Sequence, residues 1–247
     1  LELSALVIAP ERETVALRYA VAAPAPGADY PEAAFRPRDD RYGRAAAELA
    51  TDARRIAEAV RAEGGDGPTV AAALAEAARA RFSYGHPERR FNDGCDAVPY
   101  LACGTTPGSC VDINTYFMAS LRAAGIEAGY FYGAFFPRER DRTEDGRLVH
   151  AARDGHCWVA TRHPDGDGGA TLEWDVAHHM KAGLGPVRPA LDPRPGRRVA
   201  LSHSMGHVLE IAGARVEAKV LGTPVTVKGG RAAPADLEGL TLSAAAP

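Results

Sequence analysis

One helical segment followed by strand-like runs constrains the fold of this chain more than any other feature. Gly108-Ser109-Cys110 opens the segment, apolar residues then repeat at three- and four-residue intervals, and Gly125 ends it. These apolar residues are Ile113, Phe117, Leu121 and Ala124. The strand-like runs that follow are residues 127–136, 156–161 and 171–176. The order predicts a helix that begins at Cys110 and leads into a set of strands.

Length and charge narrow the class of protein. The chain has 247 residues, 46% of them hydrophobic, which is enough for a sizeable core without disulfides or metals. The chain has 29 basic and 32 acidic residues, so it carries no net positive charge that would attract nucleic acid. Charged residues or glycines interrupt each apolar stretch well before the ~20 residues that a membrane span requires. We therefore expect no nucleic acid and no membrane as partners. Residues 1–10 lack the pattern of a signal peptide, so we expect a cytoplasmic location.

The cysteines and histidines do not form a recognisable metal motif. The chain has four cysteines, which form no Cys-x-x-Cys pair and are too few for a disulfide scaffold: Cys95, Cys103, Cys110 and Cys157. We predict free thiols, with a Cys95–Cys103 bridge as the alternative. His178 and His179 would point in opposite directions on a strand, so we do not expect them to bind one metal together. The chain also lacks H-E-x-x-H and the Gly-rich nucleotide motifs, so no metal and no cofactor is expected.

Cys110 stands where a nucleophilic thiol is favoured. At a helix start, unpaired N–H groups and the positive end of the helix dipole lie beside the sulfur, and both favour the thiolate. A small buried core residue is the alternative interpretation of such a cysteine. The assignment of Cys110 therefore depends on a neighbouring base.

The last two strand-like runs supply a candidate base. Residues 162–170, between the runs, contain the Pro, Gly and Asp residues typical of a turn. With the turn centred near residues 165 and 166, antiparallel pairing places His156 opposite Asp175, about 4.5–5.5 Å apart at Cβ. Such an Asp would orient the imidazole and leave its second nitrogen to the thiol. A surface His–Asp pair is the alternative. Cys157 should face the other side of the sheet, in the core.

Four segments, taken in order, resemble the transglutaminase-like core of the papain-type cysteine enzymes. They are Gly108-x-Cys110, the run LRAAGIEA that begins at Leu121, Gly155-His156-x-Trp158-Val159, and Glu173-Trp174-Asp175. The resemblance covers roughly residues 65–180. It implies a papain-like α+β fold in which a helix that carries the cysteine packs on an antiparallel β-sheet that carries His and Asp. It also implies acyl transfer through a thioester, with Cys110 as nucleophile, His156 as general base and acid, and Asp175 orienting His156.

Three positions depart from the pattern of the cross-linking members. Ser109 stands where many of them have Gln, and Val111 stands where they often have Trp. Both departures put protein cross-linking in doubt. Val176 replaces the Pro frequently seen after the Asp of the family, which leaves the role of Asp175 intact but makes the neighbouring pocket unusual.

Acyl transfer also requires donors for the developing oxyanion. The amide of Cys110, at the helix start, is the predicted first donor. The second donor is left open by the sequence. Candidates for this donor or for other substrate contacts are Asn92, Tyr100, Thr105, Ser109, Trp158 and His178.

The other segments suggest a division of the chain. Strands are expected at residues 3–9 and 14–21, and short strands after residue 197. Helices are expected at residues 44–61 and, with Thr69 as the N-cap, from there to about residue 82. We expect residues 1–64 to form N-terminal strands and a helix, residues 65–185 the transglutaminase-like catalytic core, and residues 186–247 a C-terminal β extension. The three parts are expected to form one compact unit.

These expectations define a reaction class but leave the acceptor open. The predicted substrate is a peptide, amide or thioester acyl donor. Water as acceptor gives a peptidase or amidase, and an amine acceptor gives an amide-forming acyltransferase. We favour hydrolysis, because the sequence shows no dedicated acceptor site. A catalytically idle binding module of the same fold is the remaining alternative.

Overall fold

The computed structural model describes residues 30–38, 40–151, 155–164, 170–191, 193–211, 214–221, 225–228, 231–234 and 241–243. The strands expected at residues 3–9 and 14–21 lie outside these ranges, as does the expected centre of the turn at residues 165 and 166. Among the helices of the described ranges, none combines the length and the apolar character needed to cross a bilayer.

The two helices expected before residue 82 are present, and one of them is capped differently from our prediction. The helices are α1 (Glu32–Phe35), α2 (Ala47–Ala62), α3 (Gly67–Arg81), α4 (Cys110–Ala123) and α5 (Val176–Lys181), with a 3-10 turn η1 (Arg138–Arg140). We expected Thr69 to cap α3, and this is wrong. Asp66 is the cap, because its side chain accepts a hydrogen bond from the Thr69 backbone N–H at 2.9 Å.

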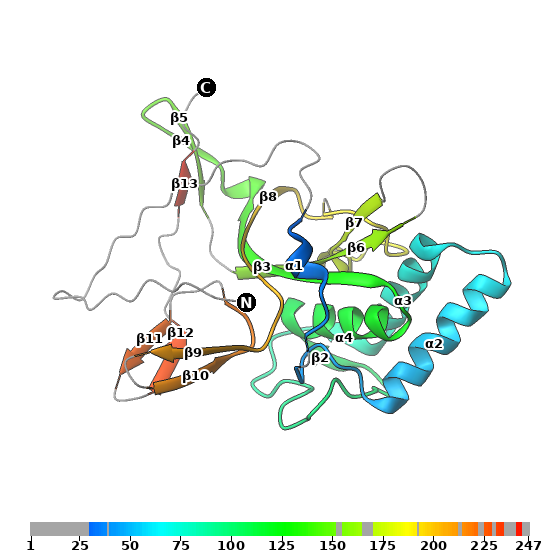
Figure 1. The fold of residues 1–247 in the computed structure, drawn as a ribbon. Helices are drawn as coiled ribbons and strands as arrows, with labels where there is room; N and C mark the ends of the chain where they lie inside the picture. The colour runs from blue at the N-terminus through cyan, green and yellow to red at the C-terminus, as the bar shows by residue number, and fades with distance from the viewer. Residues whose placement is uncertain are drawn as a thin grey trace.

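A four-stranded antiparallel sheet lies at the centre of the fold, in the order β7-β6-β3-β8 (Figure 1). Its strands are β3 (Glu127–Pro137), β6 (Gly155–His163), β7 (Ala170–Trp174) and β8 (Gly196–His203). The first three correspond to the strands predicted from the sequence. β8 belongs by sequence to the C-terminal extension, yet it pairs with β3 and completes the same sheet.

Short strands surround this sheet. β1 (Phe82–Tyr84) pairs in parallel with β2 (Thr106–Gly108). β4 (Arg142–Glu144), β5 (Arg147–Ala151) and β13 (Thr241–Ser243) form a second antiparallel sheet. β9 (His207–Ile211) pairs with β10 (Ala214–Ala218), and β11 (Val225–Lys228) pairs with β12 (Arg231–Pro234). The C-terminal residues thus form β structure, as expected.

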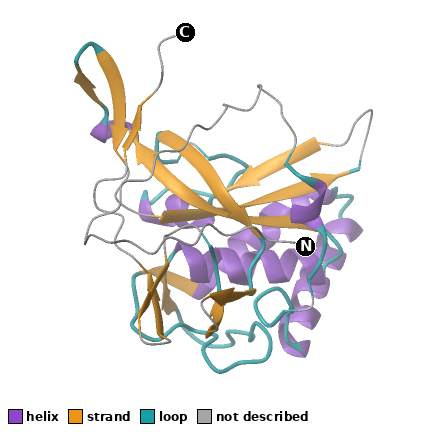
Figure 2. Cartoon of the chain, turned by 60° about the vertical axis from the view of Figure 1, so that its left-hand side comes forward, coloured by secondary structure: helices purple, strands orange, loops and turns teal. Residues whose placement is uncertain are grey.

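Helices α2, α3 and α4 gather on one side of the central sheet (Figure 2). α4 is buried along most of its length, and its apolar residues Ile113 and Phe117 share one core with Val159 and Trp174 of the sheet. On the opposite face, α1 covers Trp158 and neighbouring residues in a second cluster. The helix that begins at Cys110 is therefore held in the largest core of the described chain.

The register of the β6–β7 hairpin differs by two residues from our prediction. Val159 pairs with Trp174, so a continued ladder would place Asp175 opposite Trp158 rather than His156. The ladder ends at Trp174, and Val176, which we expected in the strand, begins α5. The prediction that His156 pairs directly with Asp175 across the hairpin is therefore wrong. A shift of two residues keeps every side chain on its face, because the pleat has a period of two.

One extra residue interrupts the ladder between β3 and β8. Tyr132 pairs with Ser202 but Gly133 pairs with Ala200, so Leu201 is the extra residue of a β-bulge. A Cβ atom on residue 133 would lie 1.9 Å from the carbonyl oxygen of Val199. Only glycine allows this close approach of the two strands.

Candidate active site

The structure brings Cys110, His156 and Asp175 together in one buried cluster. Cys110 is the first residue of α4, His156 lies at the start of β6, and Asp175 is the N-cap of α5. His156 Nε2 lies 2.8 Å from Asp175 Oδ2, and the Cys110 thiol is close enough to His156 to raise the pKa of its ring. Their relative exposures are 7%, 4% and 0% for Cys110, His156 and Asp175, so bulk water screens their charges weakly.

Asp175 reaches His156 because the chain leaves the strand at this point. As the cap of α5, Asp175 accepts a hydrogen bond from the His178 backbone N–H through Oδ1, at 3.0 Å. Its other oxygen, Oδ2, is then directed at His156 Nε2. The contact that the hairpin register was expected to supply is thus supplied by a helix cap.

The start of α4 is held in place by the residues on either side of Cys110. Ser109 is the N-cap, and its side chain and that of Asp112 form a capping box. Before them, β2 ends at Gly108, where a Cβ atom would lie 2.6 Å from the Phe82 ring. Because Cys110 is the first helical residue, as predicted, its N–H is one of those without an intrahelical partner.

The electrostatics of the cluster favour a thiolate beside an imidazolium. The neighbouring Cys157 thiol and His156 lower the pKa of Cys110 well below its usual value, against the opposing effect of burial. Burial tends to lower the pKa of His156, but Asp175 and Cys110 outweigh it and raise this pKa to about 9. Burial likewise opposes ionisation of Asp175, yet His156 and His178 hold its pKa well below the usual value. At neutral pH the sulfur and the carboxylate are therefore negative and the ring between them is positive.

Cys157 is a second thiol at the site, and its contact there was missed in the sequence analysis. It is fully buried in the core beside α4, as expected for its position on β6. Its thiol is close enough to that of Cys110 for each to shift the pKa of the other. Burial and the Cys110 thiol raise the pKa of Cys157 well above its usual value, so Cys157 stays protonated. Its position next to His156 in the sequence was the one available signal.

Two further side chains contact the Asp175 carboxylate. Arg198 Nη2, from β8, donates to Asp175 Oδ2 at 2.9 Å and lies 3.0 Å from His178 Nδ1. The ring of His178 stacks on that of His156, with centroids 3.9 Å apart. Of the candidate substrate contacts, His178 is thus the one that the structure places against the His–Asp pair. The sequence contains no motif that links Arg198 to Asp175, so this contact could not be predicted from it.

The spacing of His156, Asp175 and His178 resembles that of metal ligands, since their ligand atoms lie within 4.8 Å of one another. Arg198 already supplies a cation to the same carboxylate oxygen. A metal ion would have to displace this guanidinium, so the donor set does not fit a divalent cation. His178 and His179 lie on α5 rather than on a strand, which corrects our assumption, and His179 Nδ1 lies 3.1 Å from the Asp175 backbone oxygen.

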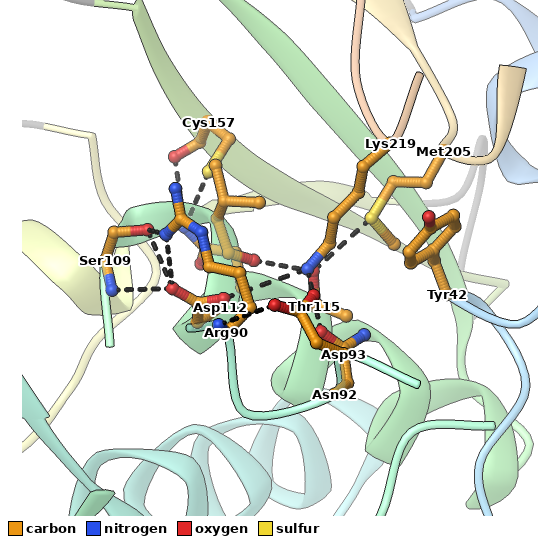
Figure 3. Close-up of polar contacts among 12 residues, drawn as sticks. Tyr42, Arg90, Asn92, Asp93, Ser109, Asp112, Thr115, Cys157, Met205 and Lys219 are labelled. Atoms are coloured by element: carbon orange, nitrogen blue, oxygen red, sulfur yellow. Dashed lines mark hydrogen bonds and ion pairs between the residues drawn. The ribbon is translucent and has the colours of Figure 1, made fainter. Parts of the chain in front are cut away.

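Two of the other candidate substrate residues belong to a buried ionic cluster around Asp112 (Figure 3). Asp112 Oδ2 accepts hydrogen bonds from the Ser109 backbone N–H and hydroxyl, both at 2.9 Å, and from Arg90 Nη1 at 2.7 Å. Lys219 reaches in from the C-terminal segment, with Nζ 3.8 Å from Asp112 Oδ1 and 3.2 Å from Asn92 Oδ1. Ser109 and Asn92 thus support the start of α4.

The structure places the remaining candidates elsewhere. Trp158 Nε1 donates to the Tyr30 hydroxyl at 2.9 Å, in the cluster on the opposite face of the sheet. The Tyr100 hydroxyl accepts from Arg81 Nη2, also at 2.9 Å, and its ring borders a shallow hollow along α2. Thr105 is exposed in the loop before β2. The structure does not bring these three residues to Cys110.

Replacing Asp112 by alanine is expected to destabilise the protein by about 3–5 kcal/mol, because Arg90 and Lys219 would lose a carboxylate that is fully buried. Urea unfolding measures this change. Glu48, exposed in the first turn of α2, is the matched control, and Glu48→Ala should leave the unfolding midpoint nearly unchanged. Equal midpoints for the two variants would contradict the role of Asp112.

The central part of the chain matches a known protein family. Residues 53–169 match the family model of the transglutaminase-like superfamily, whose members generally carry out cysteine-dependent acyl transfer or hydrolysis. The matched stretch contains Cys110 and His156 and ends before Asp175. No curated protein matches the chain. The match agrees with a helix that begins at a cysteine and packs on an antiparallel sheet, and on these grounds residues 53–169 form a core of the transglutaminase-like superfamily, with its papain-like fold.

Proposed function

We propose that this protein is a cysteine-dependent amidase or peptidase, in which Cys110, His156 and Asp175 act as a catalytic triad. The observation that supports the proposal is the contact of the three groups: a thiol at a helix start, an imidazole in contact with it, and a carboxylate 2.8 Å from the far ring nitrogen. The order nucleophile, base and orienting acid is the one that thiol acyl transfer needs.

The reaction begins with a nucleophile that is already ionised. The Cys110 thiolate attacks the carbonyl carbon of the substrate, and its own backbone N–H, at the start of α4, is placed to donate to the oxyanion. The C–N bond then breaks, and the imidazolium of His156 gives its proton to the leaving amine, which leaves a thioester on Cys110.

Water completes the cycle. Neutral His156 accepts a proton from a water molecule that attacks the thioester carbon, the C–S bond breaks, and the carboxylic acid leaves. The thiolate and the imidazolium are thereby restored. Asp175 Oδ2 holds the Nε2 proton of His156 throughout, so that Nδ1 is the nitrogen that exchanges a proton with the reacting groups.

The residues before and after Cys110 favour water over a protein amine as acceptor. Ser109 replaces the Gln of many cross-linking members, and its hydroxyl is bound to Asp112 at 2.9 Å and to Arg90 at 2.5 Å. Val111 replaces their Trp and packs against the core around α4. Both positions therefore support the helix rather than present groups to an acceptor.

The test uses p-nitrophenyl acetate as acyl donor at about pH 7, with intact-mass analysis and peptide mapping. We expect an acetyl group on Cys110 that water removes at a rate unaffected by added methylamine or putrescine. Exposed Cys103 is the internal control for non-specific acetylation. If Cys103 reacts and Cys110 does not, the proposal is overturned. Faster release with formation of an acetylated amine would instead identify an amide-forming acyltransferase.

A further inference from the structure

We propose that Arg198 is a positioning residue that acts through Asp175: its guanidinium shares the carboxylate oxygen with His156 and thereby makes the imidazolium a better proton donor. This inference rests on the proposed function, since it concerns the same triad. It assigns a role to β8, which lies outside the matched residues 53–169.

Arg198 contacts two residues of the cluster, Asp175 and His178, through the same nitrogen, Nη2. Arg198 Nη2 lies 2.9 Å and His156 Nε2 lies 2.8 Å from the same oxygen, Asp175 Oδ2. The two cationic groups are therefore separated by less than about 6 Å and share one anionic oxygen. The guanidinium also lies 4.8 Å from the centroid of the Phe135 ring, which in turn contacts the rings of His156 and His178.

Stability alone does not account for this arginine. Its side chain is 6% exposed, and within the described part of the chain its Nε has no hydrogen-bond partner. Burying a cation costs free energy that a salt bridge recovers only in part. Asp175 is in addition already held by the backbone N–H of His178 and by His156. What Arg198 adds is a permanent positive charge at the carboxylate.

This charge has a defined effect on His156. The groups that face the His156 ring are the Cys110 thiol of α4, Asp175 and His178 of the α5 segment, Phe135 of β3 and, through Asp175, Arg198 of β8. Cys110 and Asp175 are negative and stabilise the imidazolium. Arg198 has the opposite effect, since the fixed positive charge of its guanidinium, so close to His156, disfavours a positive charge on the imidazole ring. A less basic imidazolium releases its proton to a leaving amine more readily.

The Arg198→Gln variant separates charge from hydrogen bonding, because glutamine can still donate to Asp175 but carries no charge. The readout is the rate of alkylation of Cys110 by iodoacetamide from about pH 4 to about pH 10, followed by peptide mapping. In the wild type we expect a plateau bounded by two inflections, the upper one from deprotonation of His156 at about pH 9. In Arg198→Gln the upper inflection should move upward by about one pH unit.

Three further variants complete the experiment. Arg198→Lys keeps the charge and should return the upper inflection close to the wild-type position. Arg197→Met is the matched control, because Arg197 is exposed one residue earlier on β8, and its profile should coincide with that of the wild type. Arg198→Met provides a second neutral variant should Arg198→Gln fail to fold.

The outcomes distinguish this inference from the proposed function. Superimposable profiles for the wild type and the neutral Arg198 variants, both with two inflections, would overturn the role of Arg198 and leave the triad in place. A shift of equal size in Arg198→Lys would overturn it as well, because the charge is retained. If wild-type Cys110 at about pH 6 reacts no faster than Cys103, the proposed function itself fails.

Discussion

Cys110→Ala is expected to abolish the acetyl-enzyme formed from p-nitrophenyl acetate and to reduce turnover to the background rate. In hydrolases that use a nucleophile and a base as one unit, removal of the nucleophile costs about 10⁵-fold or more. The protein should remain folded, with a free energy of unfolding within about 1 kcal/mol of the wild type, since only one sulfur atom is lost from a small side chain. Mass spectrometry measures acylation, and urea unfolding measures stability.

Two cysteine variants serve as controls for this result. Cys103→Ala removes an exposed thiol in the loop before β2 and should retain full activity. Cys157→Ala removes the neighbouring thiol that lowers the pKa of Cys110, so this pKa should be higher in the variant than in the wild type. Acylation should therefore persist but weaken as the pH falls toward this higher pKa. Turnover by Cys110→Ala at the wild-type rate would show that another residue is the nucleophile.

Asp175→Asn is expected to slow hydrolysis of the acetyl-enzyme by about 10³- to 10⁴-fold. An amide in place of the carboxylate no longer favours the tautomer with the proton on Nε2 and no longer stabilises the imidazolium. Because Asp175 raises the pKa of His156, this pKa should fall in the variant, and alkylation of Cys110 at about pH 6 should slow. The decay of the acetyl-enzyme, followed by intact mass, measures the first effect.

Glu173 provides a matched control for the loss of one carboxylate. It lies two residues earlier, on β7, and its side chain accepts a hydrogen bond from Tyr30 rather than from His156. Glu173→Gln should therefore leave hydrolysis of the acetyl-enzyme unchanged. If the acetyl-enzymes of Asp175→Asn and Glu173→Gln decay at the same rate, the carboxylate of Asp175 has no part in the reaction.

Features set by neighbouring residues were predicted from the sequence with good accuracy. Gly108, Ser109 and the apolar spacing after Cys110 identified the first residue of α4, because helix starts and helix periodicity are local properties. The alternation along β6 is also as expected, with Cys157 and Val159 in the core beside α4 and Trp158 in the second cluster.

Features that depend on distant segments could not be predicted in this way. The hairpin register was wrong by two residues, because it depends on the shape of a long turn rather than on the strands that the turn joins. Arg198 and Lys219 reach Asp175 and Asp112 from segments that we expected in the C-terminal β extension. Each is an ordinary basic residue in the sequence, and the pairing of β8 with β3 is what brings Arg198 to Asp175.

The bulge opposite Gly133 determines on which face of the sheet the charge of Arg198 lies. Gly133, which has no side chain, pairs with Ala200, and Arg198 lies two residues from Ala200 on the same strand. If the pairing of Tyr132 with Ser202 continued without interruption, Arg198 would stand across from Phe136 instead of Phe135 and would project from the reverse surface. Any larger residue at position 133 would clash with the Val199 carbonyl in the bulged arrangement. Without the bulge, the chain would keep every ionisable group it has now, yet lose the guanidinium from beside Asp175.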